Sequence, residues 1–124
     1  MKNQTVLNLA INILIFFLLS SISASRISFG ETQASLIAQG KKIAFNRKKG
    51  NCLACHAIKG GSLPGNIGPP LINMRDRYPD KEQLQTQIWD PTQYNQHSIM
   101  PPFGKHEILT KEELDKVVEF VYSL

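Results

Sequence analysis

The sequence predicts a small all-α domain. Three segments repeat apolar residues with the period of a helix, and two of these segments begin at a residue suited to capping. The stretches between them are rich in glycine and proline, which disfavours helices and central strands. A length of 124 residues leaves room for one such domain and a short leader.

The composition is mildly basic, with a formal net charge of +4. Lysine and arginine do not alternate with aromatic residues, so the sequence gives no support for nucleic-acid binding. A cluster of basic residues could steer an acidic partner, but a solvated helix face is the preferred interpretation. This cluster consists of Lys41, Lys42, Arg47, Lys48 and Lys49.

Residues 1–25 differ in composition from the rest of the chain. Lys2 is their only charged residue, an apolar run covers residues 6–19, and small residues follow as far as Ser25. This arrangement predicts a secretory signal peptide that is cleaved near Ser25. An uncleaved membrane anchor is the alternative, but a spanning helix needs about 20 predominantly apolar residues and this run is shorter.

The first predicted helix covers about residues 32–47. Its apolar residues form one face, and Gly40 offers a position without a side chain where the C-terminal helix can cross closely. The apolar residues are Leu36, Ile37, Ile43 and Ala44.

The two cysteines of the chain stand together as Cys52-Leu53-Ala54-Cys55-His56. This pattern is typical of haem c attachment, because two thiols at this spacing reach the vinyl groups on one edge of a porphyrin. The imidazole of His56 then points at the iron as the proximal ligand. The prediction is one covalently attached haem c.

Three other interpretations of the cysteine pair are weaker. A structural or redox disulfide leaves His56 without a role. A thioredoxin-like motif needs a βαβ setting, and no strand is predicted before Cys52. A zinc site would recruit His97 and His106 at spacings unlike those of common zinc motifs.

A loop rich in glycine and proline follows the haem motif, over residues 60–70. A haem-ligating histidine usually donates its second ring N–H to a carbonyl or a carboxylate. The carbonyl of Pro69 is the predicted acceptor for His56.

The next predicted helix begins at Asp80 as N-cap, with Gln83 at position N3, and stops at Asp90 before Pro91. Leu84, Ile88 and Trp89 are expected to point inward, with Trp89 in the core rather than in a functional site.

Four residues are candidates for the second axial ligand: Met74, His97, Met100 and His106. Met100 is preferred, because the prolines that follow it make a stiff loop that can hold a weak thioether ligand. His97 is the main alternative. Met74 lies among apolar residues, where methionine more often fills a gap in the core, and His106 resembles a surface residue.

The C-terminal helix is predicted from Thr110 to about Ser123. Thr110 as N-cap and Glu113 at N3 form a capping box, and Leu109 with Leu114 is placed as a hydrophobic staple. One apolar stripe is expected to face the core. It comprises Leu114, Val117, Val118, Val121 and Tyr122.

The order of these features resembles the class I cytochromes c, with three to four helices around one haem, here within residues 26–124. Within that superfamily, the sequence resembles the SoxX family at residues 50–58, 63–71 and 100–106. The Gly68-Pro69 pair resembles class I cytochromes c in general. The resemblance implies a periplasmic electron-transfer subunit whose distal ligand is Met100.

The SoxX resemblance also implies partners. The expected one is a SoxA-like dihaem or monohaem cytochrome subunit, with which SoxX forms the SoxAX heterodimer. That complex, an L-cysteine S-thiosulfotransferase, oxidatively joins thiosulfate to a cysteine of the SoxYZ carrier, and another cytochrome is the expected downstream acceptor. In this family the conjugation belongs to SoxA.

The residues agree with a non-catalytic role, because both thiols are consumed as thioethers and no cysteine nucleophile remains. Two further hypotheses stay open. One is a free monohaem cytochrome c that shuttles electrons, and the other is a thiol–disulfide protein without haem.

Overall fold

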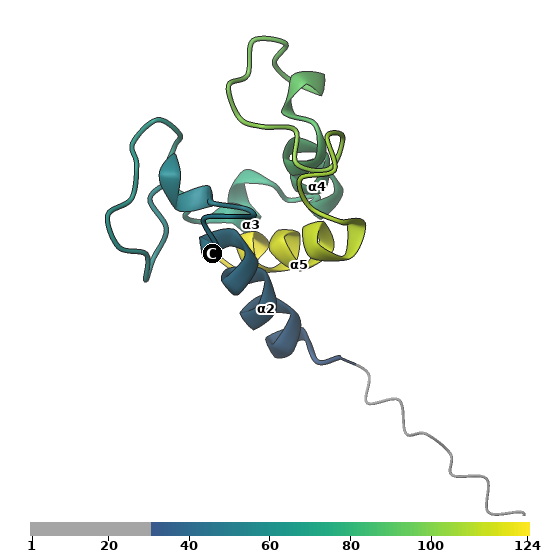
Figure 1. Ribbon diagram of the computed structural model, residues 1–124. Coiled ribbons are helices and arrows are strands. Elements are labelled where there is room, and N and C mark those ends of the chain that lie inside the picture. Colours follow the sequence, from purple (N-terminus) through teal and green to yellow (C-terminus); the bar gives the residue numbers. More distant parts are fainter. Residues whose placement is uncertain (1–30) are drawn as a thin grey trace, which may run out of the picture. The chain divides into compact units, whose positions relative to one another are not determined.

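The computed structural model describes residues 31–124, and the expected signal peptide lies outside the described residues. The described part contains four α-helices and two short 3-10 helices, and it contains no strand (Figure 1). The all-α prediction is therefore confirmed. The α-helices are α2 (Gln33–Phe45), α3 (Met74–Arg77), α4 (Lys81–Trp89) and α5 (Lys111–Tyr122); the 3-10 helices are η1 (Cys52–Ala54) and η2 (Pro91–Gln93).

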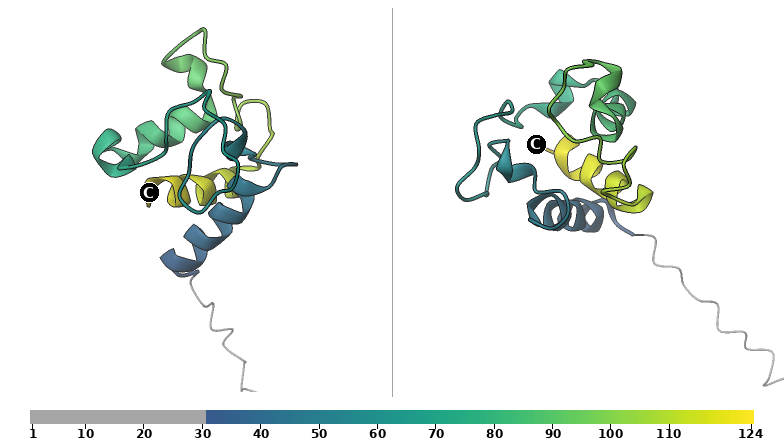
Figure 2. Two further views of the ribbon diagram at one scale, coloured as in Figure 1. Left: turned by 90° about the vertical axis from the view of Figure 1, so that its left-hand side faces the viewer. Right: turned by 45° about the horizontal axis from the view of Figure 1, so that its top comes forward.

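Helices α2 and α4 both pack against α5, as two further views show (Figure 2). The crossing of α2 and α5 depends on Gly40, because a Cβ atom there would lie 1.9 Å from the carbonyl oxygen of Lys116. Next to the crossing, the rings of Phe45 and Phe120 meet edge to face with centroids 5.9 Å apart. The crossing at Gly40 is as predicted.

Helix α2 ends two residues before the predicted boundary at Arg47. Its C-cap is Asn46, whose backbone is extended and whose N–H bonds the carbonyl of Ile43. The chain then turns back, and the N–H of Gly50 also reaches the carbonyl of Ile43 at 3.3 Å. This early turn brings the cysteine motif close to the end of α2.

The predicted N-caps of α4 and α5 are confirmed. Asp80 accepts a hydrogen bond from the backbone N–H of Glu82, and Thr110 and Glu113 form a complete capping box. The prediction that Trp89 points into the core is wrong, because this side chain is 40% exposed. Leu84 and Ile88 lie one helical turn apart and are buried, whereas Trp89 is about 100° further around the helix.

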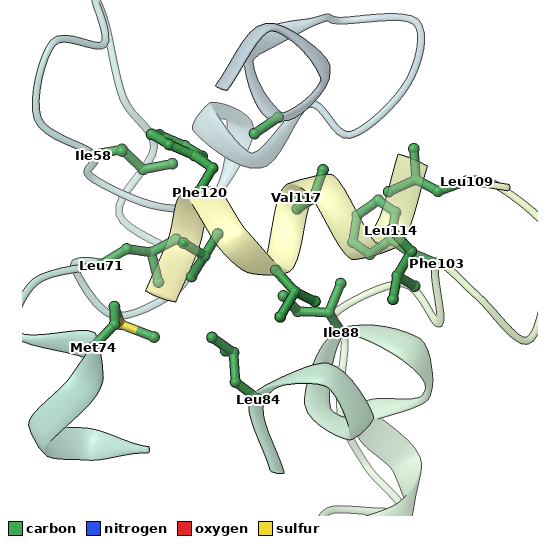
Figure 3. Close-up of a cluster of buried hydrophobic side chains, with 13 residues drawn as sticks. Ile58, Leu71, Met74, Leu84, Ile88, Phe103, Leu109, Leu114, Val117 and Phe120 are labelled. Carbon is green, nitrogen blue, oxygen red and sulfur yellow. The ribbon is translucent and has the colours of Figure 1, made fainter. Parts of the chain in front are cut away.

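The core lies along α5 (Figure 3). Residues from the loop after the cysteine motif, from α3 and from α4 approach this helix, and Ile58, Met74 and Leu84 are among them. Four of the five residues in the predicted stripe are buried, and Tyr122 is half-buried. Phe120 is also buried, because it meets α2 rather than the face that α4 covers. Within residues 31–124, no helix is long and apolar enough to cross a membrane.

Candidate functional site

A tight turn connects α2 to the cysteine motif. Asn51 adopts a left-handed conformation with φ of 48°, which asparagine tolerates better than most residues. The motif then winds into η1, and the N–H of His56 bonds the carbonyl of Cys52 at 2.9 Å. Cys52 and His56 are thus held one helical turn apart by backbone hydrogen bonds.

The imidazole of His56 is fixed by the loop that follows it. Its Nδ1 atom lies 2.7 Å from the carbonyl oxygen of Pro69, the acceptor expected from the sequence. The loop is tied back to the motif, because the N–H of Gly68 bonds the carbonyl of Cys55 at 2.8 Å. Since Pro69 accepts at Nδ1, the Nε2 atom of His56 remains available to a metal.

A cavity of about 770 Å³ opens beside the motif. This volume is within the range of small-molecule and cofactor sites. Apolar side chains of α4 and α5 form much of its wall, including Leu84, Ile88 and Val117. All five predicted site residues line it: Cys52, Cys55, His56, Pro69 and Met100.

The loop that carries Met100 is docked on the end of α4. The N–H of Phe103 bonds the carbonyl of Ile88 at 3.2 Å, and the N–H of Gly104 bonds that of Trp89 at 3.1 Å. Gly104 must lack a side chain here, because a Cβ would lie 1.9 Å from Cε3 of Trp89. The exposed Trp89 therefore serves as a platform for this loop.

A buried carboxylate fastens the same loop. Asp90, directly after α4, receives a hydrogen bond from Lys105 Nζ at 2.7 Å and another from the hydroxyl of Thr92 at 2.5 Å. The Lys105 and Thr92 donors hold the pKa of Asp90 below its usual range.

The other ligand candidates are placed differently. Met74 also lines the cavity, but it is only 2% exposed and belongs to the core cluster. Its sulfur is 3.4 Å from Nη1 of Arg77. His97 is exposed and lines the cavity, whereas His106 is exposed and is not part of the lining.

The two thiols are not joined in a disulfide. Burial raises the pKa of the Cys52 thiol to about 11, so this thiol is protonated at neutral pH. Nucleophilic attack needs a thiolate. Within residues 31–124, no three His, Cys, Asp or Glu residues are grouped so as to hold a metal ion by themselves.

These features fit a haem. The apolar wall suits a porphyrin, two thiols lie on the cavity lining, and His56 and Met100 present an imidazole and a thioether to the same space. Gly68 leaves room for the histidine ring, because a Cβ there would come 2.4 Å from its Cε1 atom.

A family model for cytochrome c matches residues 37–124, which is most of the chain. The chain belongs to the cytochrome c family. Membership implies covalently bound haem c and a role in electron transfer. The helical fold and the apolar cavity lined by two thiols, an imidazole and a thioether are both consistent with this membership.

Two further proteins are similar to this cytochrome. An "Uncharacterized lipoprotein" of Aquifex aeolicus is 36% identical to this chain over 98 residues. The aligned region covers 76% of this chain and 48% of the lipoprotein. The chain thus spans about half the length of this curated relative. The crystal structure of SoxXA from P. pantotrophus contains a chain that matches with a TM-score of 0.63 and 26% identity, over 69% of this chain and 79% of that chain. The cytochrome is accordingly a SoxX-like class I cytochrome c.

The sequence did not identify every residue of the cavity. Gln87 on α4 lines it, and its Nε2 atom lies 3.9 Å from the sulfur of Met100. Arg47 and Lys48 line it as well, although the sequence placed them only in a basic cluster. The signal for Gln87 was a polar residue three positions after Leu84, on the face where α4 is otherwise apolar.

Proposed function

We propose that this cytochrome holds one haem c through thioethers to Cys52 and Cys55, with His56 and Met100 as axial ligands, and that it transfers single electrons. The observation that carries the proposal is that one cavity is lined by both thiols, His56 and Met100. Haem c supplies one-electron iron redox chemistry when bound.

Each residue has a defined task in this proposal. Pro69 accepts the Nδ1–H of His56 across 2.7 Å, which fixes the tautomer and leaves Nε2 for the iron. Met100 offers a soft thioether, a ligand that raises the reduction potential of a haem and suits it to accept electrons. The apolar wall keeps water from the site.

The proposal extends to location and partner. An extracytoplasmic site of action is supported by the leader-like composition of residues 1–25 and by the similarity to SoxXA. A SoxA-like cytochrome is the proposed partner, in a complex that conjugates thiosulfate to a carrier cysteine. The chain's two thiols are both assigned to haem attachment, so the sulfur chemistry would occur on another chain.

A free electron shuttle is the second candidate function. It is favoured by the basic residues Arg47 and Lys48 beside the cavity, since such residues can steer transient acidic partners. Gel filtration of the native exported protein separates the two functions. Elution with a larger haem subunit supports the SoxX-like role, and elution as a monomer supports the shuttle.

The distal ligand is tested by three substitutions. Met100→Ala should abolish the far-red sulfur-to-iron absorption band of the ferric protein, whereas His97→Ala and Met74→Leu should leave it intact. Persistence of the band in Met100→Ala would show that another residue is the ligand.

A further inference from the structure

We infer that Gln87 positions the sulfur of Met100 and tunes the reduction potential of the site, by donating a hydrogen bond from its side-chain amide. This inference rests on the proposed function, because it takes Met100 as the axial ligand. The direct observation is the 3.9 Å distance between Gln87 Nε2 and Met100 Sδ.

The position of Gln87 on α4 calls for a physical explanation. Leu84, Gln87 and Ile88 lie on one face of the helix, and all three line the cavity. Leu84 and Ile88 are buried, so an apolar residue would be expected between them. A half-buried amide in an apolar wall loses hydration, and this loss is offset only when the amide is hydrogen-bonded.

The chemistry of the pair fixes which group donates. A thioether sulfur has no proton and can only accept, so the NH₂ end of the Gln87 amide must face Met100. A donor aimed at the sulfur withdraws electron density from it and weakens it as a ligand to ferric iron. A hydrogen bond from Gln87 therefore favours the ferrous state and raises the potential.

The backbone holds the two residues together. Helix α4 carries Gln87, and the carbonyls of its next two residues, Ile88 and Trp89, receive hydrogen bonds from the loop that carries Met100. Donor and acceptor thus belong to one hydrogen-bonded unit. Met100 is fixed further by its own N–H, which bonds Ser98 Oγ at 3.3 Å.

A matched pair of substitutions tests the inference. Gln87→Leu removes the amide and keeps an apolar side chain of comparable bulk. Gln85→Leu makes the same change on the same helix, where the Gln85 amide bonds Asp115 at 3.0 Å instead of Met100. The readouts on the exported holoprotein are the midpoint potential, the position of the far-red band and the thermal midpoint of unfolding.

Gln87→Leu should lower the midpoint potential and move the far-red band to longer wavelength, while Gln85→Leu changes neither. Gln87→Ala should shift the potential in the same direction as Gln87→Leu, which covers the case in which leucine disturbs packing. A shift shared by Gln87→Leu and Gln85→Leu, or no shift in either Gln87 variant, would overturn the inference. A wild-type protein without the far-red band would instead refute the Met100 assignment, and the inference with it.

Discussion

Gly68 lies against the imidazole of His56 so closely that the ring occupies the space of a side chain at position 68. A Cβ atom at this position would come 2.4 Å from Cε1 and 2.6 Å from Nδ1 of the ring. The next residue, Pro69, supplies the carbonyl that bonds the same Nδ1 atom. Residues 68 and 69 therefore act together on the orientation of the proposed proximal ligand.

Substitution of Gly68 should disturb haem binding more than folding. In Gly68→Ala, the methyl group displaces the ring and breaks the bond to Pro69. Loss of a group that orients a metal ligand typically costs about tenfold or more in metal affinity. Weaker capture of haem before the thioethers form should lower the fraction of exported protein that carries haem. Absorbance of haem relative to protein measures it.

Gly61→Ala is the control for this experiment. Its Cβ would meet the flexible end of Leu53, at 2.3 Å from Cδ2, and the carbonyl oxygen of Ile58 at 3.2 Å, rather than a ligand ring. A leucine methyl can move, so haem content should stay near the wild-type level. Equal losses in the two variants would argue against a specific role for Gly68.

The helix crossing at Gly40 contributes to the stability of the domain. Gly40→Ala places a methyl group against the Lys116 carbonyl and forces α2 away from α5. Overpacking of this kind costs about 1–3 kcal/mol of unfolding free energy. Urea titration followed by circular dichroism measures the loss. Lys42→Ala, at an exposed site on α2, should be close to neutral.

The first turn of α5 depends on its capping box. Thr110→Ala leaves the N–H of Glu113 without its side-chain acceptor, which costs about 1 kcal/mol. Thr110→Ser keeps the hydroxyl and should retain most of the stability. If the alanine and serine variants unfold at the same urea concentration, the cap contributes nothing measurable.

Acid should weaken the attachment of the Met100 loop through Asp90. Because Lys105 and Thr92 lower the pKa of this carboxylate, its ionised form stabilises the folded state. That stabilisation is complete above the unfolded pKa of about 3.9 and is lost as the pH falls through the lower folded value.

Asp90→Asn should therefore unfold at lower urea than the wild type at pH 7, and the difference should shrink toward pH 3. Glu112→Gln is the control, because the Glu112 side chain is largely exposed and its pair with Lys116 should contribute little. A difference for Asp90→Asn that does not change with pH would contradict the assignment.

Local signals in the sequence were sufficient for much of the fold. The capping residues Asp80 and Thr110 and the stripe on α5 depend on neighbours within a few positions, and all appear in the structure. Helix α3 was not predicted, because four residues carry too little periodicity to be recognised. Trp89 was misplaced because its size favours burial, whereas its position at the end of α4 leaves it exposed beside Gly104.

The candidate site was likewise predicted only in part from the sequence. The cysteine motif could be predicted from five consecutive residues, because two thiols at this spacing followed by a histidine are typical of haem c attachment. The contact between Gln87 and Met100 could not, because it depends on how the Met100 loop docks on α4. A short sequence pattern thus predicts the residues proposed to hold the haem, whereas the role inferred for Gln87 depends on a tertiary contact.

Covalent attachment of haem tests the central claim most directly. The wild-type chain and the double variant Cys52→Ser/Cys55→Ser are each expressed and exported in a host with a working haem-attachment system. Both proteins are then denatured, and their masses are measured by mass spectrometry. The wild-type chain should retain the added mass of one haem and give a two-thioether pyridine haemochrome spectrum, and the double variant should lose the haem on denaturation. A wild-type chain of unmodified mass under these conditions would contradict the account.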